Sequence, residues 1–404
     1  MRRPTEPLSQ SEFVALVALM FSIVAMATDI MLPALGIIGR DLAVADPNDA
    51  QLVVSSLFAG FAVGQMFAGP ISDAIGRKPA IYIGYTIFII GCILSLVAED
   101  LQTMLIGRAL QGLGAAPCRI ITVAMVRDSY AGRAMAKIMS IALSIFILVP
   151  AIAPAVGQGI LLAFSWHNIF VFLILMAVIS TSWLALRQPE TLPPEKRRAF
   201  SLLNIFAGLR EIMGVRVTVG YTLATGCVFG CFLGYLSSTQ QIFQTSYGVG
   251  EMFPLYFALA ALTIGVSSVT NSKLVMRLGM RVLSIRALIS LTAFSTVFFV
   301  LSLLVWGGLP PMWTFLVWQV CTFLSVGMLF GNLNALAMEP LGHMAGLGSA
   351  FVGSISSFMS LPLGWSIGRL YDGSVLPLVG GFAVLGAAAL VISIVTDRHG
   401  DTAA

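Results

Sequence analysis

The sequence predicts an all-α membrane protein of twelve transmembrane helices, and three observations lead to this fold class. Of its 404 residues, 58% are hydrophobic and only 10% are charged, whereas soluble domains carry about 25% charged residues. Apolar runs of the length that crosses a bilayer, roughly 20 residues, follow one another along almost the whole chain. A polar stretch near the middle separates two sets of six such runs. With so few polar side chains, we expect lipid to cover most of the surface.

Hydropathy places the helices as follows. The first six are expected near 13–36, 51–72, 79–98, 102–125, 138–163 and 168–186. The other six are expected near 214–237, 252–272, 283–306, 311–336, 345–368 and 375–396. The chain therefore divides into an N-terminal six-helix bundle at 1–186, a linker loop at 187–212 and a C-terminal six-helix bundle at 213–404.

The distribution of basic residues predicts the orientation. If the N-terminus is cytoplasmic, all but four of the 22 Lys and Arg residues fall on the cytoplasmic side or at that membrane edge. The exceptions are Arg40 and Arg369 outside, and Arg108 and Arg119 within the membrane. This is the asymmetry of the positive-inside rule. We therefore expect a multi-pass protein of the cytoplasmic (inner) membrane with both termini and the linker in the cytoplasm.

The two halves resemble each other at one position. Residues Asp73–Lys78 follow the second predicted helix, and Arg277–Arg281 follow the eighth. Two six-helix repeats are typical of secondary transporters, which bind their substrate near the bilayer midplane where the repeats meet. The sequence thus favours a transporter.

The first half contains a motif between its second and third helices, Gly69-Pro-Ile-Ser-Asp-Ala-Ile-Gly-Arg-Lys-Pro79. We expect Gly69 to end a closely packed helix and Gly76 to permit a tight turn. Asp73 is a carboxylate suited to capping a helix or pairing with an arginine. The segment resembles the loop signature of the major facilitator superfamily, Gly-x-Leu-Ala-Asp-Arg-x-Gly-Arg-Lys, with Ala74 where that family has Arg. The resemblance implies the twelve-helix fold of that family and a gating loop of six residues: Gly69, Asp73, Gly76, Arg77, Lys78 and, at the end of the fourth helix, Arg127. In the family the Asp pairs across the two halves, here with the start of the eleventh helix.

The fourth helix carries two arginines inside an apolar run. Arg108 and Arg119 are eleven residues apart and Gln111 lies between them, so all three point to one side of the helix. Buried arginines are costly and are typically functional. The segment resembles the Arg-x-x-Gln-Gly-x-Gly signature associated with proton-coupled exporters of the same family.

Asp29 in the first helix is the expected partner of these arginines. It lies at a depth similar to that of Arg108, and Pro33 cannot donate the helical hydrogen bond to its carbonyl. An intramembrane carboxylate near arginines is typical of a proton site, although a static ion pair that only fixes packing is the alternative. Whether Asp29 pairs with Arg108 or Arg119 stays open. We expect proton coupling at Asp29, Arg108 and Arg119.

The fifth helix indicates the direction of transport. Pro150, Pro154 and Gly157 form a small, kinkable face that resembles the family's antiporter signature Gly-Pro-x-x-Gly-Gly. Ser165–Phe170, Pro189–Leu192, Thr28–Pro33 and Val126–Asp128 resemble the Bcr/CflA branch of drug:proton antiporters. This resemblance implies multidrug efflux and antibiotic resistance.

The sequence therefore predicts a proton-coupled exporter of small amphipathic molecules, and a facilitator of a metabolite such as an amino acid or sugar is the alternative. Five side chains are candidates for the substrate cavity: Met26, Gln111, Phe229, Phe232 and Tyr235. No catalytic constellation is present, so we do not expect an enzyme. We expect small-molecule, proton and lipid partners, no nucleic acid and a monomer. No metal or cofactor is expected, because Cys227 and Cys231 have no His or carboxylate nearby, and the proton gradient would supply the energy.

Overall fold

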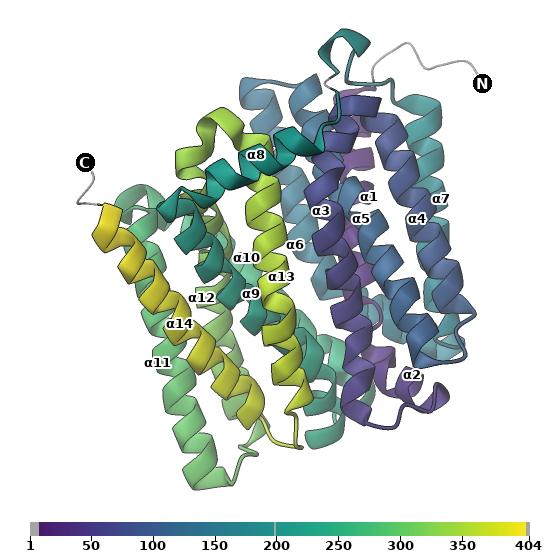
Figure 1. Cartoon of the computed structure of the whole chain (residues 1–404). Coiled ribbons are helices and arrows are strands. Elements are labelled where there is room, and N and C mark those ends of the chain that lie inside the picture. Colours follow the sequence, from purple (N-terminus) through teal and green to yellow (C-terminus); the bar gives the residue numbers. More distant parts are fainter. Residues whose placement is uncertain (1–7, 198, 401–404) are drawn as a thin grey trace. The chain divides into compact units, whose positions relative to one another are not determined.

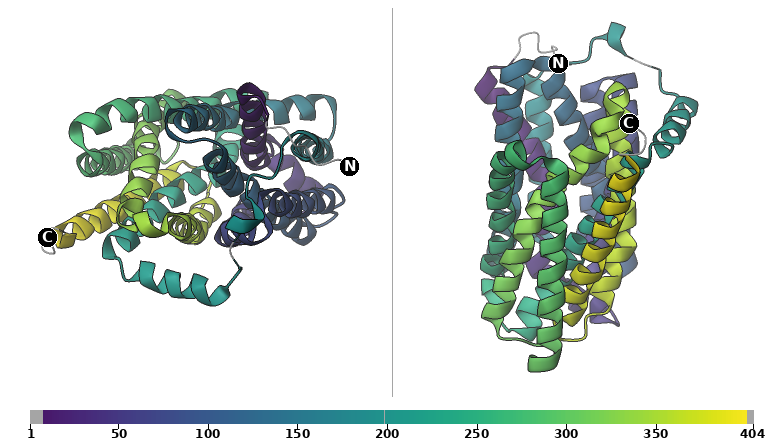
Figure 2. Two further views of the ribbon diagram at one scale, coloured as in Figure 1. Left: turned by 90° about the horizontal axis from the view of Figure 1, so that it is seen from above. Right: turned by 90° about the vertical axis from the view of Figure 1, so that its left-hand side faces the viewer.

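The protein is described by a computed structural model covering residues 8–197 and 199–400. Within these ranges it consists of helices and their connections, with no strand. This confirms the predicted all-α class and the twelve-helix arrangement in two halves. The long helices of each half run side by side, whereas α8 runs across them (Figure 1), and Figure 2 shows them end-on and from the side.

The helices of the first half begin and end as follows: α1 Gln10–Asp29, α2 Leu35–Asp41, α3 Leu52–Ile75, α4 Arg77–Leu96, α5 Leu101–Ser129, α6 Gly132–Ala163 and α7 His167–Arg187. Between α1 and α2 lies a short 3-10 turn, Leu32–Ala34, which contains Pro33. The interruption at Asp29 is the opening of the first helix that Pro33 predicts.

The second half contains α8 Leu202–Met213, α9 Arg216–Gln240, α10 Phe253–Leu278, α11 Met280–Trp306, α12 Met312–Met338, α13 Ala345–Arg369 and α14 Leu376–Gly400. A π-helical turn, Gln241–Ser246, continues α9. Much of the expected linker loop is helix α8, which includes the exposed side chains of Leu203 and Phe206.

Eleven segments of the described chain are long and apolar enough to cross a membrane. The twelfth helix is α6, which is continuous from Gly132 and has its apolar part at Leu148–Ala163. Hydropathy placed the start of this helix near 138, because its first turns carry Arg133 and Lys137. The chain is therefore a multi-pass membrane protein.

Two compact units make up the chain. One contains the chain up to Val44 and Ser56–Leu202, and the other contains Ala45–Ser55 and the chain from Leu203 onward. The short segment 45–55 thus belongs to the second unit. There Arg369 of α13 contacts Asp46 at 2.8 Å and Asp49 at 2.6 Å.

Small residues let the helices of the first unit approach closely. A Cβ atom at Gly91 of α4 would lie 2.6 Å from the carbonyl oxygen of Gly107 of α5. One at Gly114 of α5 would lie 2.4 Å from the carbonyl oxygen of Gly84 of α4. Backbone contact of this kind is how helices associate in lipid, where burial of apolar side chains gives no advantage.

Candidate functional site

The junction between α3 and α4 is a single residue. α3 ends at Ile75 and α4 begins at Arg77, and Gly76 between them has φ of 108°. Only glycine adopts this conformation without strain, which confirms the turn expected at Gly76. The motif read as a loop is therefore mostly the ends of two helices.

The expectation that a helix ends at Gly69 is wrong. α3 continues through Gly69 and Pro70 for more than a turn. Among the described residues, no atom lies within 4 Å of the place that a Cβ at Gly69 would take.

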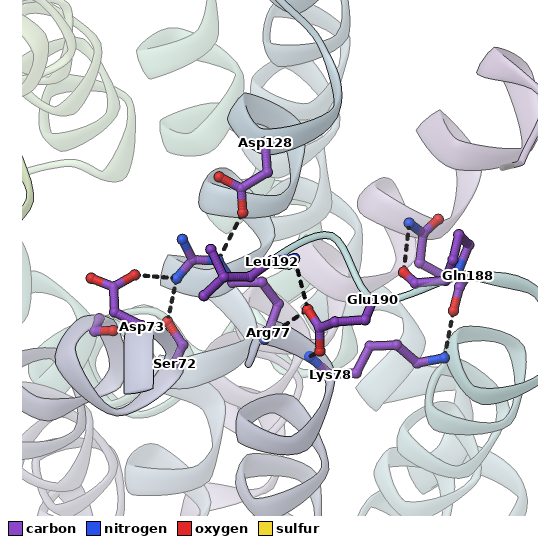
Figure 3. A network of polar contacts seen from close by, with 10 residues as sticks. Ser72, Asp73, Arg77, Lys78, Asp128, Gln188, Glu190 and Leu192 are labelled. Carbon is purple, nitrogen blue, oxygen red and sulfur yellow. Dashed lines mark hydrogen bonds and ion pairs between the residues drawn. The ribbon is translucent and has the colours of Figure 1, made fainter. Parts of the chain in front are cut away.

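Arg77 is the centre of a polar network at this junction (Figure 3). Its guanidinium is almost fully buried and donates to Asp73 Oδ1 at 2.5 Å and to Ser72 Oγ at 2.8 Å. Its Nε donates to Asp128 Oδ2, at the end of α5, at 2.8 Å. Asp73 thus pairs with an arginine of its own motif. Arg127 is exposed, and the neighbouring Asp128 makes the contact with Arg77.

Glu190, which follows α7, holds the start of α4. Its Oε1 accepts from the backbone N–H of Arg77 at 3.0 Å, and its Oε2 accepts from that of Lys78 at 3.1 Å. The first N–H groups of a helix have no partner within it and carry partial positive charge. The Lys78 ammonium donates to the carbonyl of Gln188 in the same segment (Figure 3). Sequence reasoning missed this cap because the carboxylate lies more than a hundred positions along the chain.

The second half contains a similar helix junction, with longer distances between its charged groups. Gly279, with φ of 78°, separates α10 from α11. Arg281 at the start of α11 lies 3.7 Å from Glu339 and 3.8 Å from Asp397. Asp397 also accepts a hydrogen bond of 2.5 Å from the Tyr221 hydroxyl. The weak repeat in the sequence thus corresponds to the same local structure in both halves. In each, a glycine separates two helices, and an arginine that follows it lies between two carboxylates.

Replacing Gly76 by Ala is expected to slow transport, while Gly69→Ala is expected to leave it unchanged. A Cβ at Gly76 would lie 2.8 Å from Glu190 Oε2, and a non-glycine residue at such a φ costs about 1–3 kcal/mol. The measurement is the initial flux per molecule of protein in the membrane. Equal flux in the two variants would exclude a role for the junction geometry.

Asp29 lies at the end of α1, where the helix is interrupted. Its side chain is 4% exposed, and its Oδ1 accepts no hydrogen bond from the residues that the structure describes. The charge of Arg108 acts on it electrostatically. An ionisable group is thus placed beside a helix break, deep in a membrane span.

Arg108 is fully buried and, together with Gln111, connects three helices. Its Nη2 donates to the carbonyl of Ala27 in α1 at 2.8 Å, and its Nη1 donates to Gln111 Oε1 at 2.7 Å. Gln111 is also fully buried, and its amide donates to Ser95 Oγ of α4 at 2.9 Å. Arg108 therefore reaches the backbone of α1 two residues before Asp29.

Arg119, three turns further along α5, has different surroundings. Its side chain is exposed, although it lies well inside a membrane span. Its guanidinium carbon lies 5.9 Å from the centre of the Phe61 ring, within reach of a cation–π interaction. The structure thus places Arg108 in a buried network with Ala27 and Gln111, whereas Arg119 lies beside Phe61.

Gly157 of α6 is in contact with the backbone of α1 next to Asp29. A Cβ at this position would lie 2.0 Å from the carbonyl oxygen of Ile30. Pro154, one turn earlier, is buried, and Pro150 is half-buried. The face of α6 predicted from its small residues therefore meets the interrupted part of α1.

The candidate cavity residues fall into separate groups. Phe229 and Phe232 of α9 form a half-buried cluster with Phe330 of α12, with ring centres 5.6 to 6.2 Å apart. Tyr235 is fully buried, and its ring centre lies 4.7 Å from that of Phe323. Met26 is half-buried on α1, and Gln111 belongs to the Arg108 network.

The sequence matches the family described as Major Facilitator Superfamily over residues 17–364. It is 30% identical over 332 residues to YdgK of Bacillus subtilis, named an uncharacterized MFS-type transporter, with 81% of each chain covered. It is 27% identical over 359 residues to a bicyclomycin resistance protein homolog of Haemophilus influenzae, with 87% of each chain covered.

The fold is similar to that of a solved transporter structure. The xylose transporter XylE from E. coli, in a partially occluded inward open conformation, aligns with a TM-score of 0.72 at 13% sequence identity. The alignment covers 95% of this chain and 96% of that one. At this identity the likeness concerns the fold.

Proposed function

Because the chain belongs to the major facilitator superfamily, we propose that it exports small amphipathic molecules in exchange for protons by alternating access. The relative named for bicyclomycin resistance supports a drug-like substrate. The proposal makes the chain a multidrug efflux antiporter that works as a monomer, with the proton gradient and no cofactor as its source of energy.

The observation that carries the proposal is the position of Asp29. A carboxylate in a membrane span is expensive and is typically part of a proton pathway. Asp29 combines burial, an oxygen that accepts no hydrogen bond from the described part of the chain and a neighbouring fixed charge on Arg108. A proton bound at Asp29 removes its attraction to Arg108, and release of the proton restores it. Either change alters the contact of α1 with α5.

The surroundings of Arg119 support a water-filled space beside α5. The Arg119 residue is exposed, and an arginine in a membrane span is far less costly beside water than in lipid. We propose that Arg119 faces the aqueous route of protons and substrate. Phe229 and Phe232 of α9, which are half-buried, would supply apolar contacts to the substrate.

The experiment that tests the function uses purified protein in liposomes with an imposed pH gradient. A fluorescent amphipathic compound should accumulate against its own gradient, and a protonophore should abolish the accumulation. If the compound only reaches equal concentrations on both sides, whatever the pH gradient, proton coupling is contradicted. Uphill transport of an amino acid or sugar, with no effect on amphipathic compounds, would favour a metabolite transporter.

The proposed orientation places both termini in the cytoplasm of a cell with the protein in its inner membrane. A reporter that is active only in the cytoplasm should work when inserted between α10 and α11, because this junction carries Arg277 and Arg281. It should be silent between α9 and α10, at 247–249. Activity in the reverse pattern would overturn the orientation.

A further inference from the structure

A groove of about 620 Å³ lies on the second unit, beside the turn that joins α13 to α14. The ends of α11, α13 and α14 lie near one another at the foot of Figure 1. The groove is mostly apolar and has one carboxylate among its lining residues. Those that matter below are Phe299, Leu363, Ile367, Asp372, Gly380 and Val384.

The groove is open at the surface of the second unit, along two helices that are long and apolar enough to cross a membrane. Val384 of α14 is 68% exposed and Leu370, at the end of α13, is 67% exposed. Gly380 contributes no side chain to the space, and a Cβ there would lie 3.1 Å from the ring of Phe299. An apolar surface of this shape in a membrane span is in contact with hydrocarbon chains.

The length of the groove matches one leaflet. Its residues on α14 extend from Leu376 to Leu385, a distance of roughly 13 Å at 1.5 Å per residue. The hydrocarbon layer of one leaflet is about 15 Å thick, half of the bilayer core. A lipid whose headgroup lies at the turn can therefore extend an acyl chain along the whole groove.

The charge at the mouth of the groove is negative. Asp372 Oδ1 accepts from the backbone N–H of Ser374 at 3.0 Å and from its hydroxyl at 2.6 Å. These hydrogen bonds lower the pKa of Asp372, so the carboxylate is ionised at neutral pH. The nearby cation, Arg369, is already paired with both Asp46 and Asp49. An anionic headgroup is repelled here, and an ammonium group is attracted.

We propose that this groove binds a phospholipid with a primary ammonium headgroup, with the ammonium at Asp372 and one acyl chain between α11, α13 and α14. A primary ammonium has N–H donors for the carboxylate. A trimethylammonium headgroup has none. The site is thus selective for an ethanolamine-type lipid over choline and glycerol lipids with the same chains.

Native mass spectrometry of the full-length protein tests this site. The protein is mixed with equal amounts of ethanolamine, choline and glycerol phospholipids that carry identical chains. We expect one ethanolamine lipid to be retained several times more often than either of the others. Asp372→Asn should abolish that preference, and Val384→Trp, which fills the groove, should remove the retained lipid.

Asp100→Asn is the matched control. Asp100 is also an exposed turn carboxylate that accepts from the N–H and hydroxyl of one neighbour, Thr103, and its pKa is likewise lowered by these bonds. Asp100 does not line the groove. Asp100→Asn should therefore leave the preference for the ethanolamine lipid intact. Equal retention of the three lipids by the wild type, or a preference that survives Asp372→Asn, would overturn the proposal. Lipid retention is measured without any transport. A negative result would therefore contradict the lipid site and leave the proposed proton coupling unaffected.

Discussion

Asp29→Asn is expected to bind substrate and carry it down its own gradient, but to lose uphill transport driven by a pH gradient. Asn has nearly the shape of protonated Asp and cannot exchange a proton. A gradient of one pH unit supplies about 1.4 kcal/mol per proton, or about tenfold accumulation for a one-to-one exchange. In liposomes, the wild type should approach that ratio, and the variant should stop at equal concentrations.

Two further variants sharpen this prediction. Arg108→Lys keeps the charge but loses the fork that reaches Ala27 and Gln111 in different directions, so partial coupling is expected. Asp100→Asn removes a carboxylate outside the membrane spans and should couple normally. Full accumulation in Asp29→Asn would remove Asp29 from the mechanism.

Gly157→Ala is expected to lower thermal stability and transport together, since a Cβ would overlap the carbonyl of Ile30. The obstacle is backbone, so α6 must move away from α1. Overpacking of this kind costs typically about 1–3 kcal/mol. Gly159→Ala is the control, because no described atom lies within 4 Å of the place a Cβ would take there.

The measurement for this pair is the melting temperature in detergent together with flux in liposomes. Gly157→Ala should melt several degrees lower than the wild type, and Gly159→Ala should not. Equal melting temperatures would mean that α1 and α6 are free to separate at this point.

The sequence was sufficient to predict features that depend on local chemistry. Apolar runs located the membrane helices, Pro33 located the interruption at Asp29, and Gly76 located the turn. Hydropathy failed at the start of α6, where polar turns extend the helix, and at α8, which is too short to be recognised as a membrane span. Hydropathy detects long contact with lipid and not helical hydrogen bonding.

Features that depend on distant partners could not be predicted. The role of Glu190 requires that the segment after α7 lie beside the start of α4, and no local pattern encodes this. Arg77 contacts Asp128 and not its neighbour Arg127, because Asp128 lies on the side of the α5 terminus that faces Arg77. The sequence does not show which side this is. The different surroundings of Arg108 and Arg119 arise from neighbouring helices, although the two residues point the same way along α5.

The segment 45–55 has a consequence for how the chain assembles during synthesis. It is translated early, yet its contacts with Arg369 join it to the second unit. At about 5–20 residues per second, Arg369 is made roughly 15 to 60 s after residue 55. For that interval Asp46 and Asp49 have no arginine of α13 to pair with. A ribosome that stalls before α13 therefore leaves Asp46 and Asp49 without this arginine, even when every helix of the first half has already been made.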